Sequence, residues 1–199
     1  MKSNKVIIFD FDGVIADSLA IAFEVNQLSR PTLTLERYKA GFDGNINDVK
    51  YEDKVVREVD FFKEFGDRFA TLSIDPEKKK IIQTLATEFK LFIISSTNGD
   101  IIRKYLQKLD CFTDILGNEV QSSKVKKFNM LFNKYNIKPT DIIFITDSSG
   151  DMKEAKEANI QTIVGILGGY QNEESLKKGN PTAIVENFSQ FYDFVHFYK

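Results

Sequence analysis

The stretch Val6-Ile7-Ile8-Phe9-Asp10-Phe11-Asp12-Gly13 decides the fold of this sequence. Its first four residues form an unbroken apolar run, which is typical of a strand buried on both faces. The run stops abruptly at residues 10–13, which combine two acidic residues with a glycine. We therefore predict a central strand over residues 6–9 with two carboxylates at its carboxyl end.

Two further apolar runs have the same form. Residues 91–94 stop at Ser95, and residues 142–145 stop at Thr146 and Asp147. Weaker strand patterns cover residues 113–116, 162–166 and 183–185.

Helix-length patterns lie between these runs. One of them places Val125, Phe128, Leu131, Phe132 and Tyr135 on a single helical face. Alternating strands and helices indicate the α/β class with a parallel sheet. We predict a Rossmann-like parallel sheet core formed by residues 1–16 and 76–199.

Residues 17–75 interrupt the alternation, because they show helical patterns without another convincing strand. Asp75-Pro76 is typical of an N-cap followed by proline at the first helical position, which starts the return to the sheet. One amphipathic helical stripe is predicted from Val55, Val59, Phe62, Phe69 and Leu72. We predict that residues 17–75 form a small all-helical domain, which we call the cap.

The composition excludes several classes of partner. The chain has 27 basic and 29 acidic residues and a net charge of -2, so we expect no broad basic surface for nucleic acid or a membrane. Its apolar runs are far shorter than the roughly 20 residues needed to cross a bilayer. A secretion signal is not evident, and the single Cys111 cannot form an internal disulfide. We expect a cytoplasmic protein that is a monomer or a weak homodimer.

Polar side chains follow the three strongest predicted strands. Ligands of open parallel sheets bind beyond the carboxyl ends of the strands, so the residues there converge if the strands are neighbours. Asp10, Asp12, Asp147 and Asp151 would then bring up to four negative charges together. Such a cluster requires a cation and a basic side chain. Carboxylates without histidine or cysteine partners suit Mg²⁺, which commonly shares its site with a phosphate.

The two acids of the first motif suit two chemical roles. Asp10 is placed to attack phosphorus and form an aspartyl-phosphate, which divides a difficult hydrolysis into two steps. Asp12 is placed to protonate the leaving alkoxide and later to deprotonate water.

The sequence resembles the haloacid dehalogenase-like (HAD) hydrolase superfamily, whose members are mostly Mg²⁺-dependent phosphatases. Residues 9–18 look like its first motif, Ser95 looks like its second, and residues 146–151 are similar to its fourth. The resemblance implies that Ser95 and the backbone amide of Ser96 bind phosphate. It also implies that Asp10, Asp12 and Asp147 bind Mg²⁺ and that Asp151 orients these metal-binding groups.

A lysine forms the third motif of the family, and three lysines compete for this role. Lys124 precedes the apolar helical face that starts at Val125, so its ammonium group can reach back to the strand ends. Lys126 is interpreted as a solvated residue, and Lys127 is a possible substitute for Lys124. We predict that Lys124 contacts the phosphate.

The resemblance implies a HAD-like phosphatase that hydrolyses a small phosphorylated metabolite, with the cap selecting the substrate. The presence of Asp12 argues against dehalogenation, which needs no proton for the leaving group. A phosphomutase acting on a sugar phosphate is the alternative within the family. A phospho-accepting receiver module and a catalytically silent binding protein are alternatives of other classes. The polar candidates in the cap are Arg30, Arg37, Tyr38, Asn45 and Asn47.

Overall fold

The computed structural model describes residues 5–107 and 109–197, and these residues contain a single parallel sheet. Its strands are β1 (Val6–Phe9), β2 (Lys90–Ile94), β3 (Phe112–Leu116), β4 (Ile142–Thr146), β5 (Thr162–Ile166) and β6 (Ala183–Val185). They are arranged in the order β3-β2-β1-β4-β5-β6. The predicted α/β class and all six predicted strands are confirmed. Residues 1–4, 108 and 198–199 of the predicted core lie outside the described residues.

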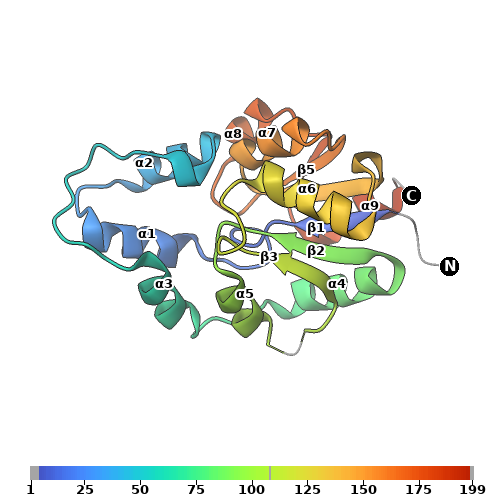
Figure 1. Ribbon diagram of the computed structural model, residues 1–199, viewed down its shortest axis with the longest axis horizontal. Helices are drawn as coiled ribbons and strands as arrows, with labels where there is room; N and C mark the ends of the chain where they lie inside the picture. Colours follow the sequence, from blue (N-terminus) through green and yellow to red (C-terminus); the bar gives the residue numbers. More distant parts are fainter. Residues whose placement is uncertain (1–4, 108, 198–199) are drawn as a thin grey trace.

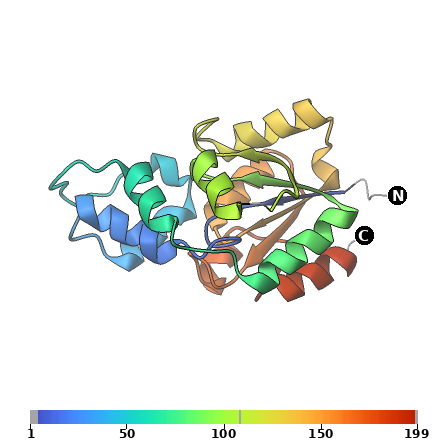
Figure 2. The ribbon, with the colours of Figure 1, turned by 90° about the horizontal axis from the view of Figure 1, so that it is seen from below.

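Helices cover both faces of the sheet. The core helices are α4 (Pro76–Glu88), α5 (Gly99–Leu106), α6 (Lys124–Tyr135), η3 (Pro139–Asp141), α7 (Ser149–Glu157), α8 (Glu173–Lys178) and α9 (Phe188–Phe197). Figure 2 shows α4 and α9 side by side on one face of the sheet and α6 on the other. Asp75 caps α4 as predicted, because its side chain accepts a hydrogen bond from the backbone N–H of Lys78.

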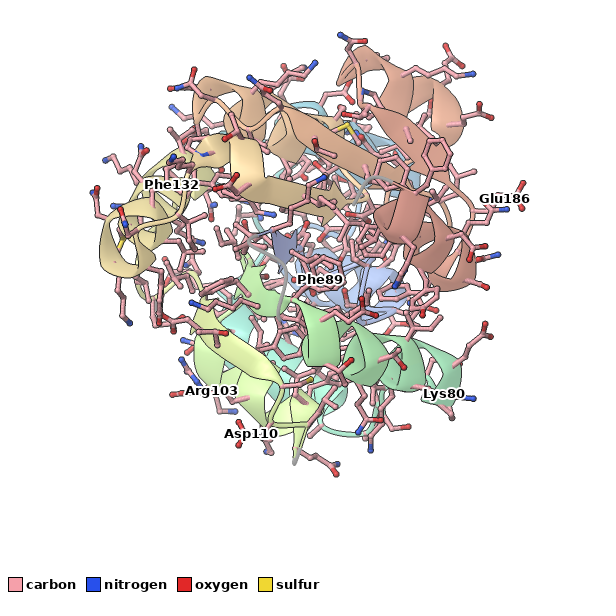
Figure 3. The ribbon with its side chains drawn as sticks, turned by 90° about the vertical axis from the view of Figure 1, so that its right-hand side faces the viewer. Lys80, Phe89, Arg103, Asp110, Phe132 and Glu186 are labelled. Carbon is pink, nitrogen blue, oxygen red and sulfur yellow. The ribbon has the colours of Figure 1, made fainter. Side chains whose placement is uncertain are left out.

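The alternation of side chains along β1 divides the core between these two layers. Ile7 and Phe9 face the layer that includes α9, where the ring of Phe9 stacks on Phe188 with the centroids 6.1 Å apart. Ile8 faces the opposite layer together with Phe128 of α6. Full burial of an aromatic or aliphatic side chain contributes about 1.5–3 kcal/mol. Figure 3 shows the side of the molecule that lies at the right in Figure 1, and the buried Phe89 lies at the centre of this view.

Residues 17–75 contain helices and no strand. The helices are α1 (Leu19–Ser29), α2 (Leu35–Ala40), η1 (Gly41–Asp43), η2 (Ile46–Asp48) and α3 (Phe61–Phe69). Figure 1 shows them at the left, beyond the carboxyl ends of the strands and opposite the N-terminus. The division into core and cap at residues 16/17 and 75/76 stays a prediction.

The predicted helical stripe that runs from Val55 to Leu72 is wrong. The helix α3 begins only at Phe61, because Asp60 caps it by accepting a hydrogen bond from the backbone N–H of Lys63. Val55 precedes this cap and is 47% exposed. The buried face of α3 is therefore short and consists of Phe65 and Phe69.

Candidate active site

The sheet brings the polar ends of three strands together. β1 lies between β2 and β4, and Phe9 is in register with both Ile93 and Ile145. Asp10 directly follows β1, and its backbone N–H donates to the carbonyl of Ile145 over 2.9 Å. Ser95 and Asp147 directly follow β2 and β4. All three side chains therefore start from the same edge of the sheet.

Lys124 joins two carboxylates at this edge. Its Nζ lies 2.9 Å from Oδ1 of Asp10 and 2.6 Å from Oδ2 of Asp151. The Thr146 hydroxyl donates to both of these carboxylates, over 3.3 Å to Asp10 and 3.0 Å to Asp151. Lys124 is the first residue of α6, and its backbone N–H donates to Glu154 over 2.9 Å. This helix start thus holds the ammonium group between the two aspartates.

The three candidate lysines have different surroundings. Lys124 lines the cavity over the strand ends. Lys126 is exposed. Lys127 is fully buried and donates to the backbone carbonyl of Ser95, and it does not line the cavity. Burial, together with the nearby charge of Lys124, lowers the pKa of Lys127 to about 8.

Asp12 is held by hydroxyl groups. Ser18 donates to its Oδ1 over 2.8 Å, and Ser95 donates to its Oδ2 over 3.1 Å. The hydroxyl of Tyr170 lies 3.1 Å from that of Ser18, which extends the chain of polar contacts. Ser95 is completely buried and also accepts from the backbone N–H of Thr97 over 2.9 Å. Its hydroxyl contacts Asp12 rather than the cavity, so its predicted contact with phosphate stays a prediction.

Asp147 fits closely against the turn that carries the first motif. Its Oδ2 accepts a hydrogen bond of 2.6 Å from the backbone N–H of Tyr170. Gly13 has a φ of +71°, and a Cβ atom there would lie 1.8 Å from the same oxygen. Only glycine meets both requirements, so residue 13 lets the Asp147 carboxylate approach the turn.

Burial dominates the electrostatics of the carboxylates. It raises the pKa of Asp10 well above its ordinary value, although Lys124 opposes the shift and Asp151 adds to it. Burial raises the pKa of Asp147 to about 7 against the hydrogen bond from Tyr170. Burial also raises the pKa of Asp12, despite the hydrogen bonds that it accepts.

Asp151 and Lys124 remain charged as a pair. Burial acts to raise the pKa of Asp151, but Lys124 and hydrogen bonds hold the pKa below its usual value. Burial acts to lower the pKa of Lys124, but Asp10 and Asp151 together raise it. One lysine does not balance the remaining carboxylates, so the cluster favours a further cation.

The predicted metal ligands Asp10, Asp12 and Asp147 all line the same cavity. Within residues 5–107 and 109–197, no three acidic, histidine or cysteine side chains are arranged to hold a metal ion. Both oxygens of Asp12 accept hydrogen bonds from hydroxyl groups, and the predicted set of Asp10, Asp12 and Asp147 stays a prediction. Asp10 and Asp147 remain as buried carboxylates with raised pKa values. Mg²⁺ is often held by only one or two carboxylates with water and phosphate oxygens, so this pair fits it.

The carboxylates face a cavity of about 280 Å³ that core and cap build together. From the core it is lined by Asp10, Asp12, Ser96, Thr97, Lys124, Asp147, Ser148, Asp151 and Tyr170. From the cap it is lined by Ala22, Asn26, Arg30, Tyr38, Phe42, Gly44, Ile46, Asn47, Val49, Tyr51, Phe61, Phe62 and Phe65. The core side of the cavity thus carries the charged groups, and the cap side is mainly apolar and aromatic.

Of the five polar cap candidates, Arg30, Tyr38 and Asn47 line the cavity. Arg37 instead pairs with buried Asp53 over 2.9 Å, and Asn45 caps η2 and contacts Glu154. Sequence reasoning missed the contacts of Ser18, Tyr170 and Glu154. The signal for Tyr170 was the preceding Gly168-Gly169 pair, because such a turn after β5 returns the chain to the strand ends.

The fold and the site define a class of protein: a parallel α/β core with a buried carboxylate cluster at its strand ends, covered by a helical insertion after the first strand. Residues 7–165 match the family described as haloacid dehalogenase-like hydrolase. The chain belongs to this family, as the first motif, Asp10 to Gly13, already indicated.

Known proteins resemble the chain over nearly its full length. A phosphoglycolate phosphatase from Vibrio vulnificus (strain YJ016) is 26% identical, with 96% of each chain covered. A phosphorylated carbohydrates phosphatase from Thermotoga maritima is 22% identical, with 92% of this chain and 94% of the relative covered. The solved structure of a haloacid dehalogenase-like hydrolase from Streptococcus pneumoniae shares the fold. It has a TM-score of 0.77 at 16% identity and covers 96% of this chain and 98% of its own.

The described residues contain no helix that combines the length and apolar character required to traverse a membrane.

Proposed function

We propose that this protein is a Mg²⁺-dependent phosphatase that hydrolyses a small phosphomonoester through an aspartyl-phosphate on Asp10. The observation that carries the proposal is the placement of Asp10. It is a buried carboxylate at the end of the central strand, paired with Lys124 and two residues before a second acid, and it faces a cavity. The phosphatase names of the two sequence relatives support it, and phosphoglycolate is a candidate substrate.

In the first step Asp10 is the nucleophile. An oxygen of its carboxylate forms a bond to phosphorus while the bond from phosphorus to the leaving alkoxide breaks. Asp12 donates a proton to that alkoxide, which leaves as an alcohol. The raised pKa of Asp12 helps this acid to hold its proton until the transfer.

In the second step Asp12 acts as the base. It takes a proton from water, and the water oxygen attacks the phosphorus of the aspartyl-phosphate. The bond between phosphorus and Asp10 breaks, so inorganic phosphate leaves and the carboxylate is restored. The hydroxyl groups of Ser18 and Ser95 orient Asp12 in both steps.

The phosphoryl oxygens require positive charge and N–H donors. Lys124 supplies the charge, and Ser96 supplies donors from the lining of the cavity. Ser95 is the further phosphate contact that its motif implies. Mg²⁺, held by Asp10, Asp12 and Asp147 with Asp151 orienting these groups, would neutralise charge on the transferring group.

The test is phosphate release from a panel of small phosphomonoesters with Mg²⁺. We expect turnover of 2-phosphoglycolate or a similar compound, and Asp10→Asn should reduce it by roughly 10³-fold or more because the nucleophile is lost. Asp193→Asn is the matched control, since Asp193 is an exposed residue of α9.

Three outcomes contradict the proposal. Undiminished turnover by Asp10→Asn refutes the nucleophile. An isomerised sugar phosphate in place of free phosphate identifies a phosphomutase. A phospho-form made from acetyl phosphate that persists for minutes without turnover identifies a receiver module.

A further inference from the structure

Arg30 is a cation at the cap side of the cavity. It directly follows α1, and its backbone is fixed on both sides. Its N–H donates to the carbonyl of Asn26 over 2.9 Å, and its carbonyl accepts from the N–H of Leu33 over 3.0 Å. The side chain therefore extends from a rigid position, and it lines the same cavity as Asp10 and Lys124.

The guanidinium group of Arg30 forms no ion pair and no hydrogen bond within residues 5–107 and 109–197. Its Nε is buried without a hydrogen bond, and no carboxylate lies within ion-pair distance of the group. The other arginines of the cap differ in this respect. Arg37 pairs with Asp53, Arg68 pairs with Glu24, and Arg57 donates to the carbonyl of Leu28. A buried donor without a partner is costly, so Arg30 is suited to a bound anion.

Tyr51 orients this guanidinium group. The ring centroid of Tyr51 lies 5.9 Å from the guanidinium carbon of Arg30, within the range of a cation–π contact. The Tyr51 hydroxyl donates to the backbone carbonyl of Tyr38 over 3.3 Å, which anchors the ring. The contact holds the planar group while leaving its N–H edges available.

We infer that Arg30 binds a carboxylate carried by the phosphomonoester substrate, so that the enzyme selects small phosphorylated acids. The inference rests on the proposed function and extends it to the substrate class. The planar fork of arginine matches a carboxylate with two parallel hydrogen bonds. Ile46, Val49 and Phe61 line the same cavity, and their apolar surroundings strengthen such a pair. A cavity of about 280 Å³ restricts the substrate to a compact molecule with phosphate at the Lys124 end and carboxylate at Arg30.

The experiment compares 2-phosphoglycolate with phosphoglycolamide, which replaces the carboxylate by an uncharged amide of the same shape. The readout is the ratio of the two kcat/KM values. We expect wild-type protein to prefer the acid and Arg30→Gln to lower that preference by about 10- to 100-fold, the range of a charge-assisted hydrogen bond. Arg30→Lys should restore part of it. Arg57→Gln is the matched control, because Arg57 is exposed and lies outside the cavity lining.

Equal use of both compounds by the wild type, or an unchanged ratio in Arg30→Gln, overturns the inference. If neither these compounds nor any other phosphomonoester of the panel releases phosphate, the proposed function fails instead. Calorimetric binding of the same two compounds to wild type and Arg30→Gln then decides the role of Arg30. Tighter binding of the acid that disappears in the variant supports the inference, and equal binding of both compounds overturns it.

Discussion

The two halves of the cavity are built on different principles. The core half comes from residues next to strand ends, and its charged groups are paired: Lys124 with Asp10 and Asp151, and Asp12 with hydroxyl groups. The cap half comes from helices and connections between residues 22 and 65, and its side chains are mainly apolar or aromatic. Its cation, Arg30, contacts the ring of Tyr51 but forms no ion pair in the described part of the chain.

We infer from this difference that the core half carries out the reaction and that the cap half selects the substrate. A group that takes part in bond breaking must be held at a fixed position before the substrate arrives, and buried ion pairs on a rigid sheet achieve this. A group that selects a substrate must be free to exchange water for that substrate. We therefore expect substitutions in the core half to affect all substrates and substitutions in the cap half to discriminate between them.

The largest expected effect is that of Lys124→Met. Removing one partner of a buried ion pair leaves the other charges uncompensated, which costs about 3–5 kcal/mol. The loss of charge stabilisation on the phosphoryl group should also lower kcat by roughly 10²- to 10³-fold for every substrate. Denaturant unfolding and steady-state kinetics measure the two effects.

Lys126→Met is the control for this change, since Lys126 is exposed two residues away on the same helix. Its stability should stay within about 0.5 kcal/mol of the wild type. If Lys124→Met loses activity on only one substrate class, the core half also discriminates between substrates, and the expected difference between the two halves is wrong.

The core half could be predicted from sequence because its positions follow from local rules. An apolar run such as residues 6–9 identifies a buried strand, and parallel strands place Asp10 and Asp147 at a common edge. The hydrogen-bond network around Asp12 could not be predicted, because Ser95 lies 83 residues from Asp12 and Tyr170 lies 152 residues from its contact Ser18.

The cap half could not be predicted beyond its helical class. The side chains that line the cavity from the cap depend on where each helix starts. The helix α3 starts only at Phe61, because Asp60 is its N-cap. The sequence does not distinguish Arg30 from Arg37, because both are polar candidates in the cap. Buried Asp53 distinguishes them in the structure, because it pairs with Arg37, whereas Arg30 forms no ion pair among the described residues.

The second prediction tests whether the core half holds a metal. At a Mg²⁺ concentration of about 100 times Kd, binding stabilises a protein by about 2.7 kcal/mol, or roughly 5–10 °C in Tm. We expect this gain in the wild type, and Asp147→Asn should remove most of it. Thermal melting with and without Mg²⁺ measures both, with Asp193→Asn as the control. An equal gain in wild type and Asp147→Asn would falsify the metal assignment.

The same variant tests the pH dependence of the metal-free protein. Burial raises the pKa of Asp147 from its ordinary value of 3.8 to about 7 in the folded state. Between these values the folded protein retains a proton that the unfolded chain has released. The contribution of Asp147 to stability therefore falls as the pH rises through this window and is level above it. Asp147→Asn should reduce the slope, and an identical slope in both proteins would contradict the raised pKa.

The smallest expected effect concerns the contact between the two halves, which we call the seam, and it is tested by Gly150→Ala. Gly150 lies in the first turn of α7, and a Cβ atom there would be 2.2 Å from the backbone carbonyl oxygen of Gly44 and 2.8 Å from that of Phe42. Since these atoms are backbone, the cap loop must move. We expect a loss of about 1–3 kcal/mol in stability. The value of kcat/KM should fall about tenfold, because the cap wall is displaced from the strand ends.

Gly44→Ala is the control for this substitution on the opposite side of the same contact. Its φ of −135° is open to any residue, and a Cβ atom there meets nothing within 4 Å. The control should therefore retain wild-type stability. If Gly150→Ala retains wild-type kinetics, the close approach at the seam has no influence on the reaction. If it instead changes only the preference between phosphoglycolate and phosphoglycolamide, the seam belongs functionally to the cap half, because the core groups would still be in place.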